Sequence, residues 1–202
     1  MLRDADREHV STKGDARCAE RFLRWHWQDW GCGGAGRYGS GGKLLYRVSA
    51  AAERDYVDEN GCVWKADQPY SEDAKWGCLG GLTVRRTEIT GVPGTKAPDV
   101  YLTERYSMDG YRFDVPNGTY SVRLHFAETY TGITKAGDRV FTVKIQGKET
   151  IKDLDVLTEA GKFATPLVKE ITGIRVTDGK LLIEFVPNVQ NPEINGIEVF
   201  GP

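Results

Sequence analysis

The sequence has no large excess of charge and no long apolar run. Its 202 residues carry a formal net charge of −2 at pH 7. Nucleic-acid-binding domains present a clearly basic surface to the phosphate backbone, so this balance argues against a nucleic-acid partner. A membrane-spanning helix needs about 20 mostly apolar residues in a row, and the sequence contains no such stretch. We therefore expect no membrane span.

Metal-binding residues are scarce. The three histidines, His9, His26 and His125, lie far apart in the sequence. The cysteines do not show the CxxC spacing that many zinc sites use. We therefore expect neither a metal nor another cofactor.

The cysteines also bear on the redox state of the protein. They are Cys18, Cys32, Cys62 and Cys78. Four cysteines allow three complete pairings, and a bridge such as Cys62–Cys78 or Cys18–Cys32 would point to an oxidising compartment. From the sequence alone, free thiols and disulfides both stay open.

The N-terminal residues 1–8 are charged throughout and lack the apolar core of a signal peptide. Three explanations stay open: the protein stays inside the cell, its true start lies elsewhere, or the sequence is a piece of a longer chain. A chain of this length predicts one domain, alone or with an extension, that can bury a core without disulfides or metals.

Residues 15–30 have the spacing of an amphipathic helix. Leu23, Trp27 and Trp30 recur at i, i+4 and i+7, and Asp15 fits an N-cap. Three of the five tryptophans lie in this segment. We expect its apolar face to pack on the rest of the chain or on a neighbouring domain, and the alternative is a helix that docks a protein partner.

Residues 31–42 contain seven glycines in twelve positions, which predicts a flexible linker. A literal GxGxxG occurs at residues 31–36, but a dinucleotide site needs a strand before this motif and a helix after it. Neither flank is predicted here, so we do not expect nucleotide binding. Residues 1–43 are assigned to an N-terminal extension and residues 44–202 to one β-domain.

From residue 44 onward the sequence predicts short strands separated by turns. In residues 119–126 apolar and polar residues alternate strictly, which predicts a strand with one buried face and one wet face that carries Arg123 and His125. The expected strands are 44–49, 82–89, 111–115, 119–126, 139–146, 149–152, 167–176, 180–186 and 194–200. A loop at 107–110 is expected to lead into the strand at 111–115. The expected tight turns are 116–118, 146–147 and 178–179. We predict an all-β fold, a jelly-roll-like β-sandwich with a short N-terminal helical extension.

Several motifs follow one another in a fixed order along this β-domain. They are Arg47–Val48, Val63–Gln68, Tyr101–Tyr106 (YLTERY), Leu124–Tyr130 (LHFAETY), Arg139–Val143 (RVFTV), Asp153–Val156 (DLDV) and Ile194–Val199 (INGIEV). Together they resemble the malectin-type carbohydrate-binding modules over roughly residues 44–201. One departure is Ala50–Ala52, where related modules carry glycines, because alanine resists a positive φ.

The resemblance implies a sugar site built from loop aromatics and polar side chains at one end of the sandwich. By position, Trp76, Tyr101 and Tyr130 would form the aromatic surface, and they should converge on one exposed concave patch. Thr131 stands where malectin has a second aromatic residue, and Gln190, before Asn191, stands where it has an aspartate. Glutamine and asparagine still donate to and accept from hydroxyls, so these two departures favour a glycan other than malectin's own diglucose. The resemblance therefore implies a carbohydrate site of Trp76, Tyr101, Tyr130, Thr131, Gln190 and Asn191.

Glu128 is the carboxylate that most resembles a catalytic group. It shares parity with Phe126 and Leu124, so it should point into the core, where a carboxylate needs a partner. Arg105 or Arg139 would supply that partner in a structural ion pair. We therefore expect no enzyme, although two exposed carboxyls facing each other across a cleft would indicate a glycoside hydrolase.

These observations predict a module that binds an oligosaccharide or polysaccharide of glucose type without altering it. The glycine-rich segment suggests an accessory module tethered to a glycoside hydrolase domain. The resemblance also implies an extracellular or periplasmic location, although this chain shows no signal peptide. The alternative function is a protein–protein interaction module that uses the same loops or the tryptophan-rich helix.

Overall fold

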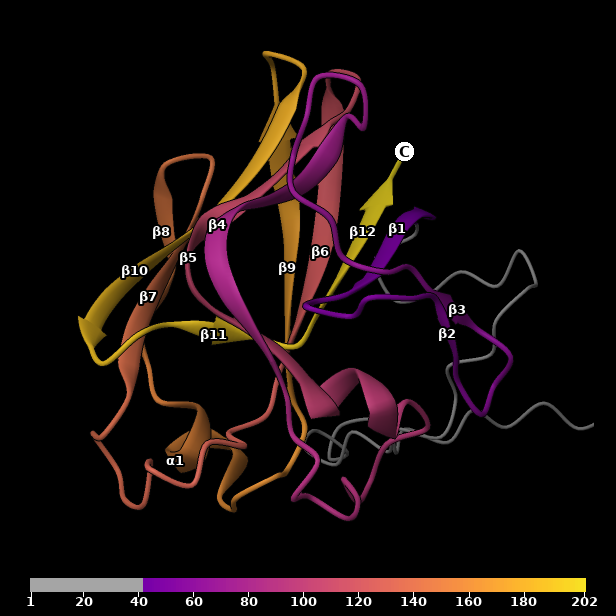
Figure 1. The fold of residues 1–202 in the computed structure, drawn as a ribbon. Helices are drawn as coiled ribbons and strands as arrows, with labels where there is room; N and C mark the ends of the chain where they lie inside the picture. The colour runs from indigo at the N-terminus through magenta and orange to yellow at the C-terminus, as the bar shows by residue number, and fades with distance from the viewer. Residues whose placement is uncertain (1–41) are drawn as a thin grey trace, which may run out of the picture.

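The computed structural model describes residues 42–202, and the predicted helix at 15–30 and the glycine-rich linker up to residue 41 lie outside this range. Figure 1 shows a β-sandwich. The strands are β1 (Lys43–Ser49), β2 (Tyr56–Val57), β3 (Val63–Trp64), β4 (Trp76–Arg85), β5 (Thr103–Asp114), β6 (Gly118–Phe126), β7 (Val140–Ile145), β8 (Lys148–Leu154), β9 (Leu167–Val176), β10 (Lys180–Val189), β11 (Glu193–Ile194) and β12 (Gly196–Gly201). A 3₁₀ helix, η2 (Pro98–Leu102), precedes β5, and a single helical turn, α1 (Val156–Ala160), follows β8.

Two antiparallel sheets form the two layers. The first has the order β1-β12-β6-β9, and the second has the order β11-β5-β10-β7-β8, with β4 paired to β5 along its other edge. Side chains from the facing sides of both sheets fill the space between them, including Phe113, Phe126 and Phe141, which are fully buried. The predicted all-β sandwich is therefore confirmed.

The predicted turns lie where the strands reverse. Gln146 and Gly147 join β7 to β8 with φ angles of 54° and 70°, the two positive values that a type I′ turn requires. Residues 177–179 join β9 to β10, but only Gly179 of the Asp178–Gly179 pair has a positive φ, at 77°, so the type I′ turn expected there is wrong. Residues 115–117 join β5 to β6. The signal at 146–147 was sufficient because β7 and β8 pair with each other, so this hairpin is closed by its own turn residues. Residues 177–179 and 115–117 instead connect one sheet to the other.

β5 differs from the sequence prediction. Residues 107–110 were expected to form a loop between two short segments, but β5 runs without interruption from Thr103 to Asp114. It pairs with β4 on one side and with β10 and β11 on the other. The polar stretch is absorbed as an irregularity, with Ser107 at a φ of 57° and a register shift opposite Leu79 and Gly80. Long-range pairing therefore outweighed the local turn signal.

β6 also differs, because both of its faces are covered. Arg123 and His125 were expected in solvent, yet they are 3% and 7% exposed. His125 packs edge-on against Trp64, with ring centroids 5.1 Å apart, and lies within hydrogen-bonding distance of Tyr101 and Glu198. Alternation along one strand shows which residues share a face, but neighbouring segments determine whether that face is wet.

In the part of the chain that the structure describes, no helix is long and apolar enough to cross a membrane.

Candidate functional site

A concave pocket of about 250 Å³ lies where several strands end. Its lining residues are Val84, Arg86, Glu104, Tyr106, Tyr130, Arg139, Gln190 and Asn191. The lining combines two phenol rings, two amides and two guanidinium groups around one carboxyl group. Such a mixture offers flat apolar surface and many hydrogen-bonding groups within one cavity.

Strand pairing brings these residues together from distant parts of the sequence. Val84 on β4 pairs with Glu104 on β5, and Glu193 on β11 pairs with Tyr106 on β5. At the other side of the pocket, Val189 at the end of β10 pairs with Val140 at the start of β7. That antiparallel pairing places Gln190, which follows Val189, and Arg139, which precedes Val140, at the same end of the sheet.

Glu104 lies at the centre of a buried ion-pair network within this lining. Its Oε2 accepts a hydrogen bond from Nη2 of Arg86 at 2.8 Å and one from the hydroxyl of Thr129 at 3.2 Å. Its Oε1 lies 3.4 Å from Nη1 of Arg139. The Glu104 side chain is only 1% exposed. Both of its oxygens are therefore engaged, and neither is an open group at the pocket surface.

Glu128 belongs to the same network. Its Oε2 lies 3.3 Å from Nη1 of Arg139, and its Oε1 accepts the backbone N–H of Tyr130 at 2.9 Å. Burial raises the pKa of Glu128 to about 7, against the opposing effect of Arg139. Arg105, the other partner that the sequence suggested, instead donates to Asp67 at 2.7 Å. Glu128 is therefore buried as expected, and of the two arginines that the sequence suggested, Arg139 is its ion-pair partner.

Glu193 lies beneath the pocket. It is fully buried, and neither of its oxygens makes a hydrogen bond within residues 42–202. Because directly opposed residues in antiparallel strands share a face, it lies on the same side of the sheet as Tyr106. Burial and the nearby Glu104 raise its pKa well above the usual range.

Three of the sequence-predicted site residues meet at the pocket. They are Tyr130, Gln190 and Asn191. Tyr130 is 41% exposed, and the guanidinium carbon of Arg86 lies 5.3 Å from the centre of its ring. Thr131 is adjacent and exposed but is not among the lining residues.

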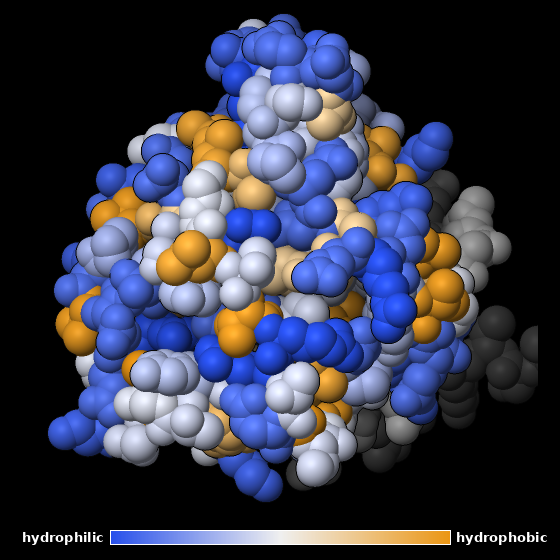
Figure 2. Space-filling model, in the orientation of Figure 1, coloured by the Kyte–Doolittle hydropathy of each residue, from blue (hydrophilic) through white to orange (hydrophobic). Residues whose placement is uncertain are grey.

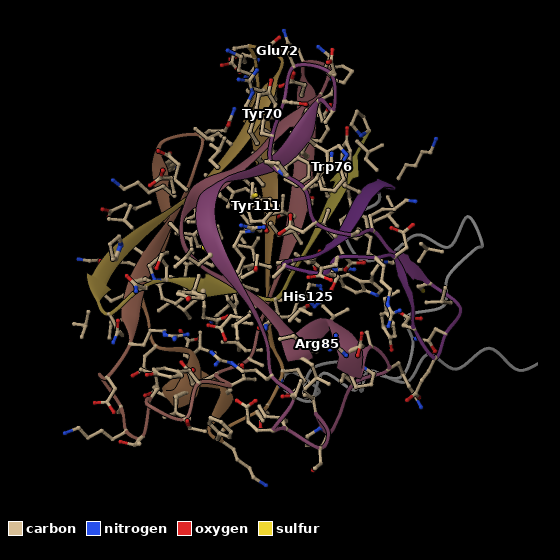
Figure 3. All side chains as sticks on the ribbon, in the orientation of Figure 1. Tyr70, Glu72, Trp76, Arg85, Tyr111 and His125 are labelled. Carbon is tan, nitrogen blue, oxygen red and sulfur yellow. The ribbon has the colours of Figure 1, made fainter. Side chains whose placement is uncertain are left out.

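Trp76 does not lie at the pocket. It begins β4, whereas Val84 lies near the end of the same strand, roughly 25 Å away for extended chain. Figure 3 shows Trp76 and Arg85 at opposite ends of this strand. The Trp76 ring is stacked on Phe113, with centroids 6.1 Å apart and planes 4° from parallel. It therefore packs on the edge of the core.

Tyr101 does not reach the pocket surface either. It is 2% exposed, and its hydroxyl lies 2.8 Å from Nδ1 of His125. Burial and the nearby Glu198 raise its pKa far above the usual value of a phenol. The expected convergence of Trp76, Tyr101 and Tyr130 on one exposed patch is therefore not what the structure shows.

Tyr106 takes the place that the sequence analysis gave to Tyr101. It closes the same YLTERY segment and lines the pocket together with Tyr130. The signal that would have found it is alternation: in a continuous β5, Tyr106 shares a face with Glu104. The predicted loop at 107–110 hid this relation. Arg86 was also missed, and no sequence pattern marked it.

The structure decides one of the possible cysteine pairings. Cys78 is a buried free thiol, so the Cys62–Cys78 bridge is wrong, while Cys18 and Cys32 lie outside the described residues. Burial raises the pKa of the Cys78 thiol, which makes it an unreactive core residue. Among residues 42–202, no group of three or more histidine, cysteine, aspartate or glutamate side chains is arranged to hold a metal ion.

Comparison with known proteins extends these observations. Residues 44–198 match the family model for the malectin domain. Malectin-B of Xenopus laevis is 28% identical over 154 residues, which are 74% of this chain and 52% of that protein. The receptor-like protein kinase FERONIA of Arabidopsis thaliana is 31% identical over 164 residues, covering 68% of this chain and 18% of that protein.

Solved structures show the same architecture. The crystal structure of Bacteroides uniformis beta-glucuronidase superposes with a TM-score of 0.70 at 26% identity, covering 78% of this chain and 18% of that one. The chain spans about half the length of the malectins that it matches.

Proposed function

Since the chain belongs to the malectin domain family, we propose that it binds carbohydrate in the pocket between Tyr106 and Tyr130. The observation that carries the proposal is the convergence of these two rings with Gln190 and Asn191 on one concavity. The C–H face of a pyranose packs on a phenol ring, while amide groups exchange hydrogen bonds with its hydroxyls. The ligand class is an oligosaccharide or polysaccharide of glucose type.

The geometry supports binding without chemistry. Canonical glycosidases need two carboxyl groups that face each other across the scissile bond. Glu104 is the single carboxyl in the described pocket lining, and both of its oxygens are engaged by neighbouring side chains. Glu128 and Glu193 are buried. The pocket therefore lacks an acid and base pair that a glycosidic oxygen could reach.

The affinity for one sugar chain should be weak, about −4 to −8 kcal/mol or roughly millimolar to micromolar, because a small open pocket offers few contacts. Modules of this kind gain effective strength when they are linked to an enzyme or to one another. The malectin-like part of the Bacteroides uniformis beta-glucuronidase is a minor fraction of that chain, which supports an accessory role beside a tethered glycoside hydrolase domain.

A glycan array tests the proposal. The full chain should bind glucose-containing oligosaccharides, and Tyr106→Ala and Tyr130→Ala should each weaken this binding at least tenfold. Tyr70→Ala serves as the matched control, since Tyr70 packs against Arg112 near the Trp76 end of β4. Folding of each variant is checked by thermal unfolding. Sugar binding that survives in both folded pocket variants would refute this site.

A second candidate function is recognition of a protein. Leu82, which pairs with Tyr106, is 58% exposed, and Val189, next to Gln190, is 48% exposed. Figure 2 shows hydrophobic residues scattered among hydrophilic ones on one face of the molecule. A protein partner would bury these two side chains. Leu82→Ser and Val189→Ser should then abolish partner binding and leave sugar binding intact, as measured by affinity capture and by the glycan array.

A further inference from the structure

Arg86 is a pocket residue whose position is held by three contacts. Its backbone N–H donates to the carbonyl of Leu102 at 2.8 Å. Its Nε and Nη2 donate to Oε2 of Glu104 at 3.3 Å and 2.8 Å. Its guanidinium carbon lies 5.3 Å from the centre of the Tyr130 ring. A guanidinium fixed in this way loses little further conformational freedom when it binds a ligand.

The anchoring leaves part of the guanidinium free. A guanidinium carries five N–H donors, two of them on Nη1. Within residues 42–202, no hydrogen bond involves Nη1 of Arg86, although the side chain lines the pocket and is 13% exposed. Nη1 therefore offers two N–H donors at a fixed position beside the Tyr130 ring, on which a sugar would pack.

The surrounding charges determine which acceptor suits these donors. Two guanidinium groups, Arg86 and Arg139, lie among three buried carboxyl groups, Glu104, Glu128 and Glu193. Glu104 forms an ion pair with Arg86 at 2.8 Å and lies 3.4 Å from Arg139, so it already compensates the charge of Arg86. A carboxylate on a ligand would meet the field of Glu104 as well as that of Arg86. Hydroxyl and ether oxygens carry no net charge, so Glu104 does not repel them in this way.

We propose that Arg86 is a ligand-contacting residue that determines specificity, donating from Nη1 to neighbouring oxygens of an uncharged pyranose packed on Tyr130. This inference rests on the proposed function. It adds that Arg86 donates to the sugar and that the sugar is uncharged.

The variants separate this role from general electrostatics. Arg86→Lys keeps the positive charge but loses the planar pair of donors. Arg85→Lys is the matched control, because Arg85 is the preceding residue and pairs with Asp99 on the surface. Arg85 ends β4 and directly follows the pocket-lining Val84. Thermal unfolding reports whether each variant keeps its fold.

The experiment is an NMR titration of the full chain with methyl glucosides and methyl galactosides, their monodeoxy analogues and the matching methyl uronides. Wild type should bind one of the neutral glycosides and bind the uronide at least about fivefold more weakly. Arg86→Lys should weaken neutral binding about tenfold or more, while Arg85→Lys should leave it unchanged.

A double-mutant cycle distinguishes direct contact from a structural effect. If Nη1 contacts a hydroxyl, removing that hydroxyl weakens binding to wild type but makes little further difference in Arg86→Lys. Additive losses for every deoxy analogue would overturn the contact, and tighter binding of the uronide would overturn the charge class. In both cases sugar binding itself would stand. Failure of wild type to bind any of these glycosides, or any sugar on the array, would refute the proposed function and this inference with it.

Discussion

At the scale of single residues, the structure tolerates backbone positions that the sequence made doubtful. Ala51 lies within the alanine run where related modules carry glycines, and its φ is 65°. Its N–H donates to Oδ2 of Asp67 at 2.7 Å. The same Asp67 oxygen also accepts from Arg105 and Tyr111. The left-handed conformation at Ala51 is thus held by a buried carboxylate that also binds two residues of β5.

Ala51→Gly should stabilise the fold. A non-glycine residue in the left-handed region costs about 1–2 kcal/mol, and glycine offsets part of that gain by its greater freedom in the unfolded chain. We expect a net gain of roughly 0.5–1 kcal/mol in the free energy of unfolding, measured by urea denaturation. Ala52→Gly is the control, since Ala52 is not among the residues with positive φ. It should destabilise the protein, and a gain at Ala52 equal to that at Ala51 would contradict the strain argument.

At the scale of elements, the loop after β6 positions the most exposed pocket aromatic. Gly132 lies against Tyr130 so closely that a Cβ at residue 132 would come within 2.5 Å of the tyrosine ring. The backbone N–H of Tyr130 is held by Glu128, and Arg86 packs on its ring. The loop therefore fixes Tyr130 by contacts with its backbone and its ring.

Gly132→Ala should weaken sugar binding with little loss of stability. Gly132 is not in the left-handed region, so alanine is tolerated by the backbone, but its methyl group forces the Tyr130 ring to move. We expect a loss of binding of about tenfold by NMR titration, and a change of less than about 1 kcal/mol in the free energy of unfolding. Gly91→Ala, where an added Cβ meets no atom within 4 Å, should change neither quantity. Unchanged affinity in Gly132→Ala would show that this tyrosine ring does not support the ligand.

At the scale of the whole molecule, two buried carboxyl networks make opposite contributions to stability. In the first sheet, burial acts to raise the pKa of Glu198, but His125 and Arg47 lower it to about 2. In the network beside the pocket, burial raises the pKa of Glu128 to about 7 and that of Glu193 well above its usual value. Both networks are buried, so solvent screens them little.

The signs of these shifts predict a stability maximum near pH 4.5 for the two networks together. A lowered pKa in the folded state contributes stability above the unfolded value of about 4.5, and this contribution is lost as the pH falls toward 2. A raised pKa contributes stability below about 4.5, which is lost as the pH rises to about 7. For Glu128 this second loss amounts to about 3 kcal/mol.

Urea denaturation from pH 2.5 to 8 measures this profile. Glu128→Gln should reduce the fall in the free energy of unfolding between pH 4.5 and 7. Glu198→Gln should reduce the fall in the same quantity below pH 4.5. Glu170→Gln is a control, since this partly exposed carboxylate lies 3.3 Å from Arg123 outside the pocket network. Stability that rises steadily from pH 4.5 to 8 in wild type would contradict the assignment of Glu128.

The sequence by itself determined the class of fold. Alternation along residues 119–126 predicted β6, and the turn residues at 146–147 predicted the β7–β8 hairpin, and the structure contains both. The ordered motifs likewise identified the malectin domain family that the match over residues 44–198 shows. These signals are local: a turn closes its own hairpin, and the period of two is set within each strand.

Only the tertiary structure decided which side chains meet at the pocket. Tyr101 and Tyr106 are equivalent in the motif, but η2 turns the first toward His125, while pairing of β5 with β4 and β11 directs the second to the pocket. Arg105 and Arg139 were equal candidates for Glu128, and the strand arrangement gave Arg105 to Asp67. The physical reason is that alternation defines faces within one strand, whereas burial and partners depend on segments far away in the sequence.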